Sequence, residues 1–482
     1  MATSGDDLHR KSVAELSAAI AAGALSPREL TDAALARVAA ADDRVQAFVA
    51  VCADEARGDA DCLTEELVHG RRRGPLHGIP IAVKDLCDTA GLRTTYGSSL
   101  FRENVPAADA EPVRRLRAAG AIVLGKANTH EFACGVSTSN PHYLTTHNPW
   151  RHDRIPGGSS GGSAAAVGGG LVALAVGSDT GGSIRIPSAL CGCVGLKPTH
   201  GRVSLRGTYP MAASCDHVGP IARTARDCAL ALNAMAGFDP EDPWSRRFPA
   251  EDFTRDLDRP LRGRRIAVAP EFRAAPLARA VDAALTRARD ALAALGAEIV
   301  RVELPPPDDA FLAANLIWVE TYAQHAHQFA AQPDAYGADV RALLEFAKSF
   351  DTAALVRSQH MRERLTQTLS LLLTDRVDAL LMPTTALEAP RIGAEYVDVA
   401  GQQMPVTLVL AAYTLLFNLT RVPAVAVPAG LGDEGLPTSV QIATAAGREA
   451  LALNIAHQLE QALWPVAQRW RDLDRVAAPL RA

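Results

Sequence analysis

The chain has 482 residues, of which 48% are hydrophobic and 21% are charged, and its formal net charge is −5. This composition is typical of a globular protein that buries a sizeable core. No basic stripe or aromatic-studded basic patch is present to neutralise phosphates, so composition argues against a nucleic-acid partner.

The pattern predicts an N-terminal helical arm, residues 1–70, packed on the core. Ser26 is a candidate helix cap with Pro27 at the first helical position, and Leu30, Leu35 and Val38 recur roughly on one face. From Gly74 onward, short apolar runs such as GIPIAVKD and AIVLGKAN alternate with helical patterns. Such alternation is typical of an α/β protein with a mostly parallel or mixed sheet.

The alternation continues to the end of the chain. LVALAVGSD, RRIAVAP, AEIVRVEL, VDALLMPTT and VPAVAVPAG are predicted strands, and residues 308–375 are predicted to be largely helical. A loop with Asp239, Pro240 and Pro243 is either a domain boundary or a surface excursion. We favour the excursion, because strands resume on both sides. The prediction is one structural domain, with residues 71–482 forming the α/β part, a large central mixed sheet with helices on both faces.

Several absences limit the function. The eight cysteines form no CxxC pair and no zinc-type spacing with histidines, which favours free thiols in a reducing compartment and predicts no metal. The N-terminus has no hydrophobic signal core, and no apolar run reaches the roughly 20 residues that cross a bilayer. We therefore expect a cytoplasmic protein without membrane contact.

The stretch PGGSSGGSAAAVGGGLVALAVGSDTGGSIRIPS, residues 156–188, is rich in glycine and serine. Residues 157–161 match the G-x-S-x-G nucleophile elbow, which would make Ser159 the nucleophile, but no strand precedes them. No phosphate-binding loop pattern is present. A flexible linker is also disfavoured, because the glycines alternate with core-like segments.

Ser183 follows a predicted strand and precedes a predicted helix, where free backbone N–H groups gather and can form an oxyanion hole. The alternative is a plain helix cap. Lys84 ends an apolar strand, where burial would lower its pKa and let the amine act as a base. The alternative is a surface lysine paired with Asp85. No local pattern places a histidine, such as His152, His200 or His217, as the base.

These segments resemble the amidase signature family. The resemblance covers PGGSSGGSAAAV…GSDTGGSIRIPS, GPLHGIPIAVKDLCDTAG, GKANTHEFACGVSTSN, DHVGPIARTARDCA and FNLTRVPAVAVPAG, in the order in which the family has them. It implies a Ser–cis-Ser–Lys triad, with Ser183 as the nucleophile, Ser159 as the bridging serine and Lys84 as the base. It further implies an oxyanion hole from the backbone of Thr180, Gly181, Gly182 and Ser183, an acyl-enzyme, and no cofactor.

The substrate stays open. The main interpretation is a stand-alone hydrolase of amides, and by the same chemistry of anilides, carbamates or small esters, acting on a small molecule and with a homodimer as the expected assembly. Ala133 matches an acyl-pocket position of the family, and the hydrophobic residues Leu408, Leu415, Leu416 and Phe417 are candidates for the leaving-group side or for plain core.

Two other functions compete with the stand-alone hydrolase. One is the glutamine-hydrolysing A subunit of a tRNA-dependent amidotransferase. Ile186 in SIRIP and the residues after GRVS depart from the usual sequence of that subunit and argue against it. The other is a catalytically silent interaction subunit, which the three filled triad positions disfavour.

Overall fold

The computed structural model describes residues 5–477. Its centre is an 11-stranded mixed sheet, a single α/β architecture as predicted. In spatial order the strands are β1 (Phe48–Val51), β3 (Ile122–Ala127), β2 (Pro80–Lys84), β4 (Leu174–Ser178), β6 (Val218–Ala222), β5 (Val194–Lys197), β12 (Ala424–Leu431), β13 (Pro437–Thr444), β9 (Ala379–Pro383), β7 (Arg265–Val268) and β8 (Glu298–Arg301). The parallel pairs are β2 with β3 and β4, and β7 with β8 and β9.

Helices cover both faces of this sheet, and β2 shows how the faces divide. Side chains alternate along a strand, so Ile81 and Val83 point to one face and Ala82 to the other. Ile81 and Val83 belong to the buried cluster that also holds residues of α1 (Val13–Ala21), α4 (Glu111–Ala118), α7 (Ala225–Met235), α8 (Arg279–Ala294) and α14 (Glu449–Leu463). Ala82 packs with α2 (Pro27–Val45), α3 (Ala53–Val68) and α5 (Gly161–Gly168), next to α6 (Arg185–Cys191).

The N-terminal segment begins with two capped helices. Ser12 and Ser26 each accept a hydrogen bond from the backbone N–H of a glutamate three residues on. The glutamate side chain accepts in turn from the serine backbone N–H, which completes a capping box. The segment is not purely helical, because β1 pairs antiparallel with β3 and forms one edge of the sheet. Its residues Phe48–Val51 are too few to give a periodic signal.

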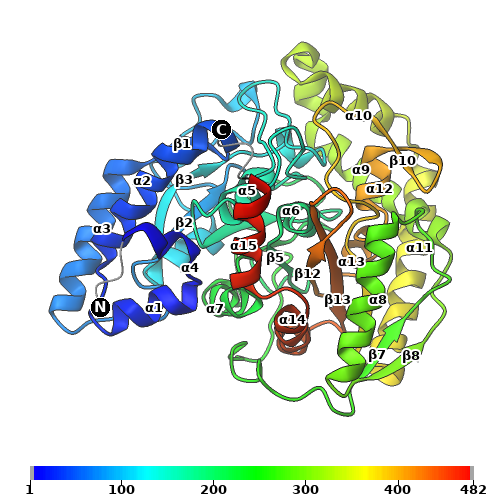
Figure 1. The fold of residues 1–482 in the computed structure, drawn as a ribbon. Helices are drawn as coiled ribbons and strands as arrows, with labels where there is room; N and C mark the ends of the chain where they lie inside the picture. Colours follow the sequence, from blue (N-terminus) through cyan, green and yellow to red (C-terminus); the bar gives the residue numbers. More distant parts are fainter. Residues whose placement is uncertain (1–4, 478–482) are drawn as a thin grey trace.

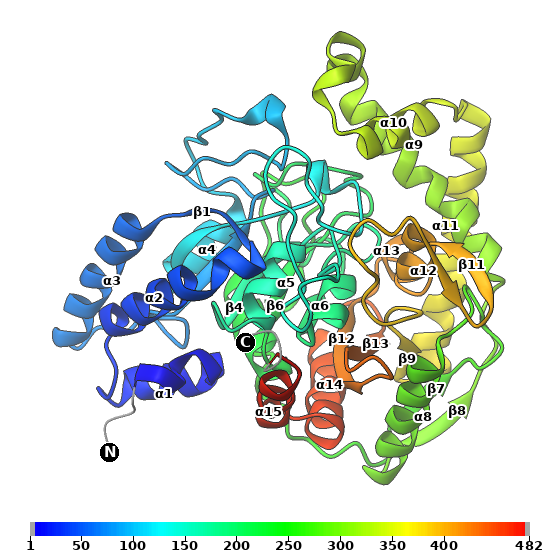
Figure 2. The same ribbon diagram turned by 45° about the horizontal axis from the view of Figure 1, so that its top comes forward.

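The segment around Asp239 is a surface excursion of one domain, because β6 before it and β7 after it belong to the same sheet. The predicted helical region 308–375 forms α9 (Pro307–Ala331), α10 (Ala338–Lys348) and α11 (Thr352–Leu371), which lie at the opposite end of the molecule from α1–α3 (Figures 1 and 2). The remaining elements are β10 (Tyr396–Val399), β11 (Gln402–Pro405), α12 (Val406–Ala411), α13 (Leu415–Leu419) and α15 (Val466–Ala477). Within residues 5–477, no helix is long and apolar enough to span a membrane.

Candidate active site

Lys84 is the last residue of β2 and is fully buried. It lies two residues after Ala82, so its side chain starts on the face covered by α5. Its Nζ atom donates to Ser159 Oγ at 2.7 Å and to Ser178 Oγ at 2.8 Å. The structure therefore joins two of the three predicted triad residues directly and adds Ser178, which the sequence did not single out.

Burial lowers the pKa of Lys84 from 10.5 to about 7. The carboxylates of Asp179 and Asp216 favour the charged amine, but the effect of burial is larger. The alternative partner, Asp85, instead accepts from Thr95 Oγ1 at 2.5 Å and lies 3.8 Å from Lys126 Nζ. A large fraction of the Lys84 amine is therefore neutral near pH 7, as a proton acceptor must be.

Ser159 precedes α5 and is fully buried, and its peptide bond with Gly158 is cis. A Cβ atom at Gly158 would lie 2.8 Å from the backbone carbon of Val136, so only glycine fits there. The carbonyl of Ser159 accepts from Thr129 Oγ1 at 3.1 Å and from the His130 backbone at 3.2 Å. These contacts hold the residue and leave its hydroxyl with Lys84.

Ser183 lies in the turn between β4 and α6 and is 8% exposed, in contrast to the fully buried Lys84 and Ser159. Its carbonyl accepts from the Ser160 backbone at 3.2 Å, which ties the two serine-bearing turns together. Its hydroxyl makes no hydrogen bond to any described residue, Ser159 included. Contacts of this kind are commonly loose before substrate binds.

The turn that carries Ser183 exposes a row of backbone donors. In the described part of the chain, the N–H groups of Thr180, Gly181, Gly182 and Ser183 have no hydrogen-bond acceptor. A Cβ atom at Gly181 would meet only Leu415, at 3.6 Å, so this side of the turn is open. Unpaired donors beside a nucleophile are what an oxyanion hole needs.

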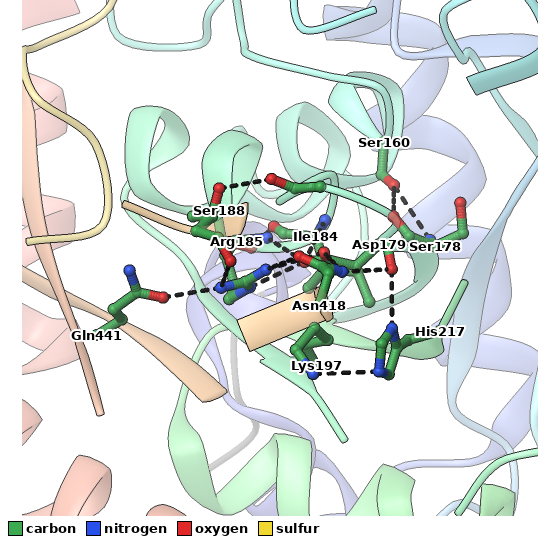
Figure 3. Close-up of polar contacts among 12 residues, drawn as sticks. Ser160, Ser178, Asp179, Ile184, Arg185, Ser188, Lys197, His217, Asn418 and Gln441 are labelled. Carbon is green, nitrogen blue, oxygen red and sulfur yellow. Dashed lines mark hydrogen bonds and ion pairs between the residues drawn. The ribbon is translucent and has the colours of Figure 1, made fainter. Parts of the chain in front are cut away.

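A buried ionic network lies beneath this turn (Figure 3). Asp179 Oδ2 accepts from the backbone N–H of Ile184 at 3.2 Å and from Arg185 Nε at 3.0 Å. Arg185 also donates to Asn418 Oδ1 at 2.6 Å and Gln441 Oε1 at 2.9 Å, which anchors the turn to α13 and β13. Burial alone would raise the pKa of Asp179, but Arg185 and other donors lower it to about 2.

This network was not predicted from the sequence. Its only sequence signal is one acidic and one basic residue, Asp179 and Arg185, inside an otherwise uncharged stretch. Lys197 and His217 extend it: Lys197 Nζ lies 3.2 Å from His217 Nε2, and burial lowers the pKa of both groups. Neither His217 nor His200 hydrogen-bonds to the three triad residues.

Ala133 is 3% exposed and belongs to an apolar cluster with Leu415, Leu416 and Phe417. Tyr96, Phe132 and Met211 also belong to it. Leu408 is partly exposed on α12 and lies outside this cluster, so the structure separates it from the other three candidates. Within residues 5–477, no group of three His, Cys, Asp or Glu side chains is placed to hold a metal ion.

Comparison with known proteins places this chain in a family. Residues 29–453 match the family model described as Amidase. The A subunit of the glutamyl-tRNA(Gln) amidotransferase of Thioalkalivibrio sulfidiphilus is 38% identical, over 94% of this chain and 97% of that one. The chain belongs to the amidase signature family, enzymes that act on amide C–N bonds.

Two solved structures are also similar. One is described as "An unexpected vestigial protein complex reveals the evolutionary origins of an s-triazine catabolic enzyme"; it is 36% identical, with a TM-score of 0.90 over 94% of this chain and 98% of that one. The other is the peptide amidase of Stenotrophomonas maltophilia, 33% identical, with a TM-score of 0.80 over 94% and 96%.

These relatives correct the expected partners. Composition argued against a nucleic-acid partner, and the main interpretation was a stand-alone hydrolase with a homodimer as the expected assembly. That conclusion is wrong, because curated relatives across most of the chain are subunits of tRNA-dependent enzymes. A protein needs a basic surface where it binds phosphates itself. A subunit of a larger assembly needs no basic surface of its own when another subunit binds the nucleic acid. The relatives support the amidotransferase alternative better than the stand-alone hydrolase.

Proposed function

We propose that the protein cleaves amide C–N bonds through an acyl-enzyme on Ser183. In this mechanism Ser183 Oγ attacks the carbonyl carbon while its proton passes through Ser159 to Lys84. The N–H groups of residues 180–183 stabilise the oxyanion. The proton then returns to the leaving nitrogen as the C–N bond breaks, and water attacks the acyl-enzyme with the same groups acting as the base.

One observation carries this proposal: a fully buried Lys84 whose pKa is lowered to about 7, in direct hydrogen bond with Ser159. A buried amine without an ion-pair partner favours the neutral state, and a serine hydroxyl can accept and donate in the same step. This is the arrangement a Ser–Lys variant of nucleophilic catalysis requires.

The test replaces Ser183 with alanine. Ser183→Ala should retain the fold, measured by circular dichroism and thermal unfolding, and should lose at least about 10³-fold in kcat/KM on an acyl anilide. Ser163→Ala is the matched control, because Ser163 is a buried hydroxyl of α5 that donates to the Val176 carbonyl at 2.8 Å. Full activity of Ser183→Ala would overturn the proposal.

The curated relatives favour glutamine as the amide, with the chain acting as the A subunit of a tRNA-dependent amidotransferase. The apolar surroundings of Ala133 and Leu415 favour the second candidate, an amidase of apolar amides, anilides or carbamates. Purified protein should be assayed on glutamine, aliphatic amides, anilides, aryl carbamates and nitrophenyl esters. Glutamine turnover that rises with glutamyl-tRNA(Gln) and the partner subunits of a relative supports the first; turnover of anilides alone supports the second.

We also propose a cytoplasmic location, in keeping with eight free cysteines, seven of them buried. The boundary between a 1–70 arm and a 71–482 domain stays a prediction. A chain that starts at residue 71 tests it: soluble, folded protein supports a separable arm. The truncation removes β1, which pairs with β3 at the edge of the sheet, and this is a physical reason to expect that the shortened chain does not fold.

A further inference from the structure

Ser178 is the second partner of Lys84 and has no part in the mechanism above. Lys84 is the only described residue with which its hydroxyl forms a hydrogen bond, at 2.8 Å. The Ser178 hydroxyl proton is therefore free to donate elsewhere. Its backbone is fixed separately, because Ser160 Oγ lies 3.2 Å from the Ser178 N–H and 3.1 Å from its carbonyl oxygen (Figure 3).

Ser178 also lines a cavity of about 220 Å³. Thr180, Tyr209, Asp216, His217 and Trp244 are among the other lining residues, and Lys84, Ser159 and Ser183 are not. The volume holds several waters at roughly 30 Å³ each. The Thr180 side chain, at the start of the oxyanion turn, donates to Asp216 Oδ1 at 2.6 Å in the cavity lining.

The position of Ser178 along β4 decides the face of the sheet to which its side chain points. Leu174 and Val176 of β4 pack on the face of α7 and α14, and alternation puts Ser178 on that same face. Its antiparallel partner in β6 is Val218, which belongs to the same cluster and also lines the cavity. Ser178 thus contacts Lys84 and also lines the cavity.

We propose that Ser178 is a proton relay between Lys84 and this cavity, the route by which the lysine releases its proton while an acyl group occupies Ser183. This inference rests on the proposed function of Lys84 as the base. In the relay, the Lys84 ammonium donates a proton to Ser178 Oγ as the Ser178 hydroxyl donates its own to a cavity water. Lys84 is left neutral and the cavity water carries the charge to solvent.

The leaving group decides when this route is needed. With an amide, Lys84 passes the Ser183 proton to the leaving nitrogen, which carries it away. With a nitrophenyl ester, the C–O bond breaks to give a phenolate that needs no proton, so Lys84 stays an ammonium. It must lose that proton before it can act as the base for water. Ester turnover depends on the relay, and amide turnover by the same acyl-enzyme does not.

The charges around Lys84 oppose the release of its proton. The carboxylates of Asp179 and Asp216 favour the charged amine electrostatically. Asp216 lines the cavity and accepts from Thr180 and from the backbone of Met211 and Ala212, and burial raises its pKa to about 6. A carboxylate at the cavity wall favours a proton there over one kept in the apolar interior.

The experiment compares 4-nitrophenyl acetate with 4-nitroacetanilide, which give the same acetyl-enzyme. In Ser178→Ala, the ester burst should stay unchanged while its steady-state rate falls at least about tenfold. Turnover of the anilide should change less than about threefold. Ser178→Thr, which restores a hydroxyl, should recover the ester rate, and Ser163→Ala should match wild type on both substrates.

A second variant keeps the inference testable if Ser178→Ala does not fold. Ala213→Phe fills the cavity without contact to Lys84 and should slow ester turnover in the same selective way. Equal loss on ester and anilide would show that Ser178 only positions Lys84, and unchanged ester turnover would show that it relays nothing; either result overturns the inference. Failure of the proposed function itself is separate, because then Ser183→Ala stays active on both substrates.

Discussion

Lys84 and Lys126 lie on neighbouring parallel strands, and both are fully buried, yet their surroundings differ. Lys126 Nζ donates to the Cys87 carbonyl and to the hydroxyls of Thr89 and Thr94, with the Asp85 carboxylate 3.8 Å away. Lys84 has two serine hydroxyls and no carboxylate within ion-pair distance.

The hydroxyls themselves also differ. Thr89 Oγ1 and Thr94 Oγ1 each donate onward to a backbone carbonyl at 3.2 Å, so their protons are already committed. The hydroxyls of Ser159 and Ser178 accept from Lys84 and donate to no described residue. A buried lysine therefore supports the fold where carboxylates and committed donors surround it, and can exchange protons where free hydroxyls do.

The largest expected effect comes from removing the Lys84 amine. Lys84→Met keeps the length of the side chain and should lower kcat/KM by about 10²–10⁴-fold, because no other group can take the Ser183 proton. Unfolding should shift little or towards higher stability, since a buried group that resists charging is replaced by an apolar one. Anilide kinetics and thermal unfolding measure both; a variant with wild-type kinetics contradicts the comparison.

Lys126→Met should show the opposite pattern. It removes the ammonium 3.8 Å from the buried Asp85 carboxyl and one donor to each of three oxygen atoms, so the free energy of unfolding should fall by about 3–5 kcal/mol. The remaining folded fraction should turn over substrate at a rate close to wild type. Urea unfolding with active-site titration separates the two, and an undiminished stability would remove the structural role of Lys126.

Gly182 and Gly181 are neighbours in the oxyanion turn but differ in the space that a side chain would have. Gly182 has φ +137°, and a Cβ atom there would lie 2.3 Å from Thr414 Oγ1, so Gly182→Ala should cost at least about 1–3 kcal/mol. A Cβ atom on Gly181 meets only Leu415 at 3.6 Å, and Gly181→Ala should change stability by less than about 0.5 kcal/mol while raising KM. Paired thermal melts and KM values check this; equal destabilisation would contradict it.

The pH profile tests the protonation state of Lys84. Burial lowers the pKa of Lys84 to about 7, and the neutral amine is the active form, so kcat/KM should rise as pH increases through about 7 and then level off. Below pH 6 it should fall about tenfold per pH unit. Anilide kinetics from pH 5 to 9 provide the measurement, and a profile flat down to pH 5 is incompatible with a lysine base.

Much of this site could be predicted from the sequence, because short-range patterns encode it. Lys84 ends an apolar strand, and Ser183 stands where a strand gives way to a helix. Ser178 and the contacts of Arg185 with Asn418 and Gln441 were out of reach, since they join residues more than 200 positions apart or depend on a register along β4. Seven strands of the sheet were predicted, whereas β1, β5, β6 and β13 were not.

The partners were predicted worst, and for a physical reason. Net charge and the lack of a basic patch describe what a chain binds through its own surface. They carry no information about an assembly in which another chain holds the nucleic acid. Relatives that are subunits of tRNA-dependent enzymes supplied what composition could not.

The central claim is that Ser183, activated through Ser159 and Lys84, is the nucleophile. A fluorophosphonate probe followed by peptide mass spectrometry tests it directly, because the probe forms a stable adduct with an activated serine. We predict a single adduct on Ser183 in the wild-type protein and at least about 10²-fold slower labelling in Lys84→Met. An adduct on Ser159, Ser160 or another serine, with Ser183 unmodified, would contradict the account.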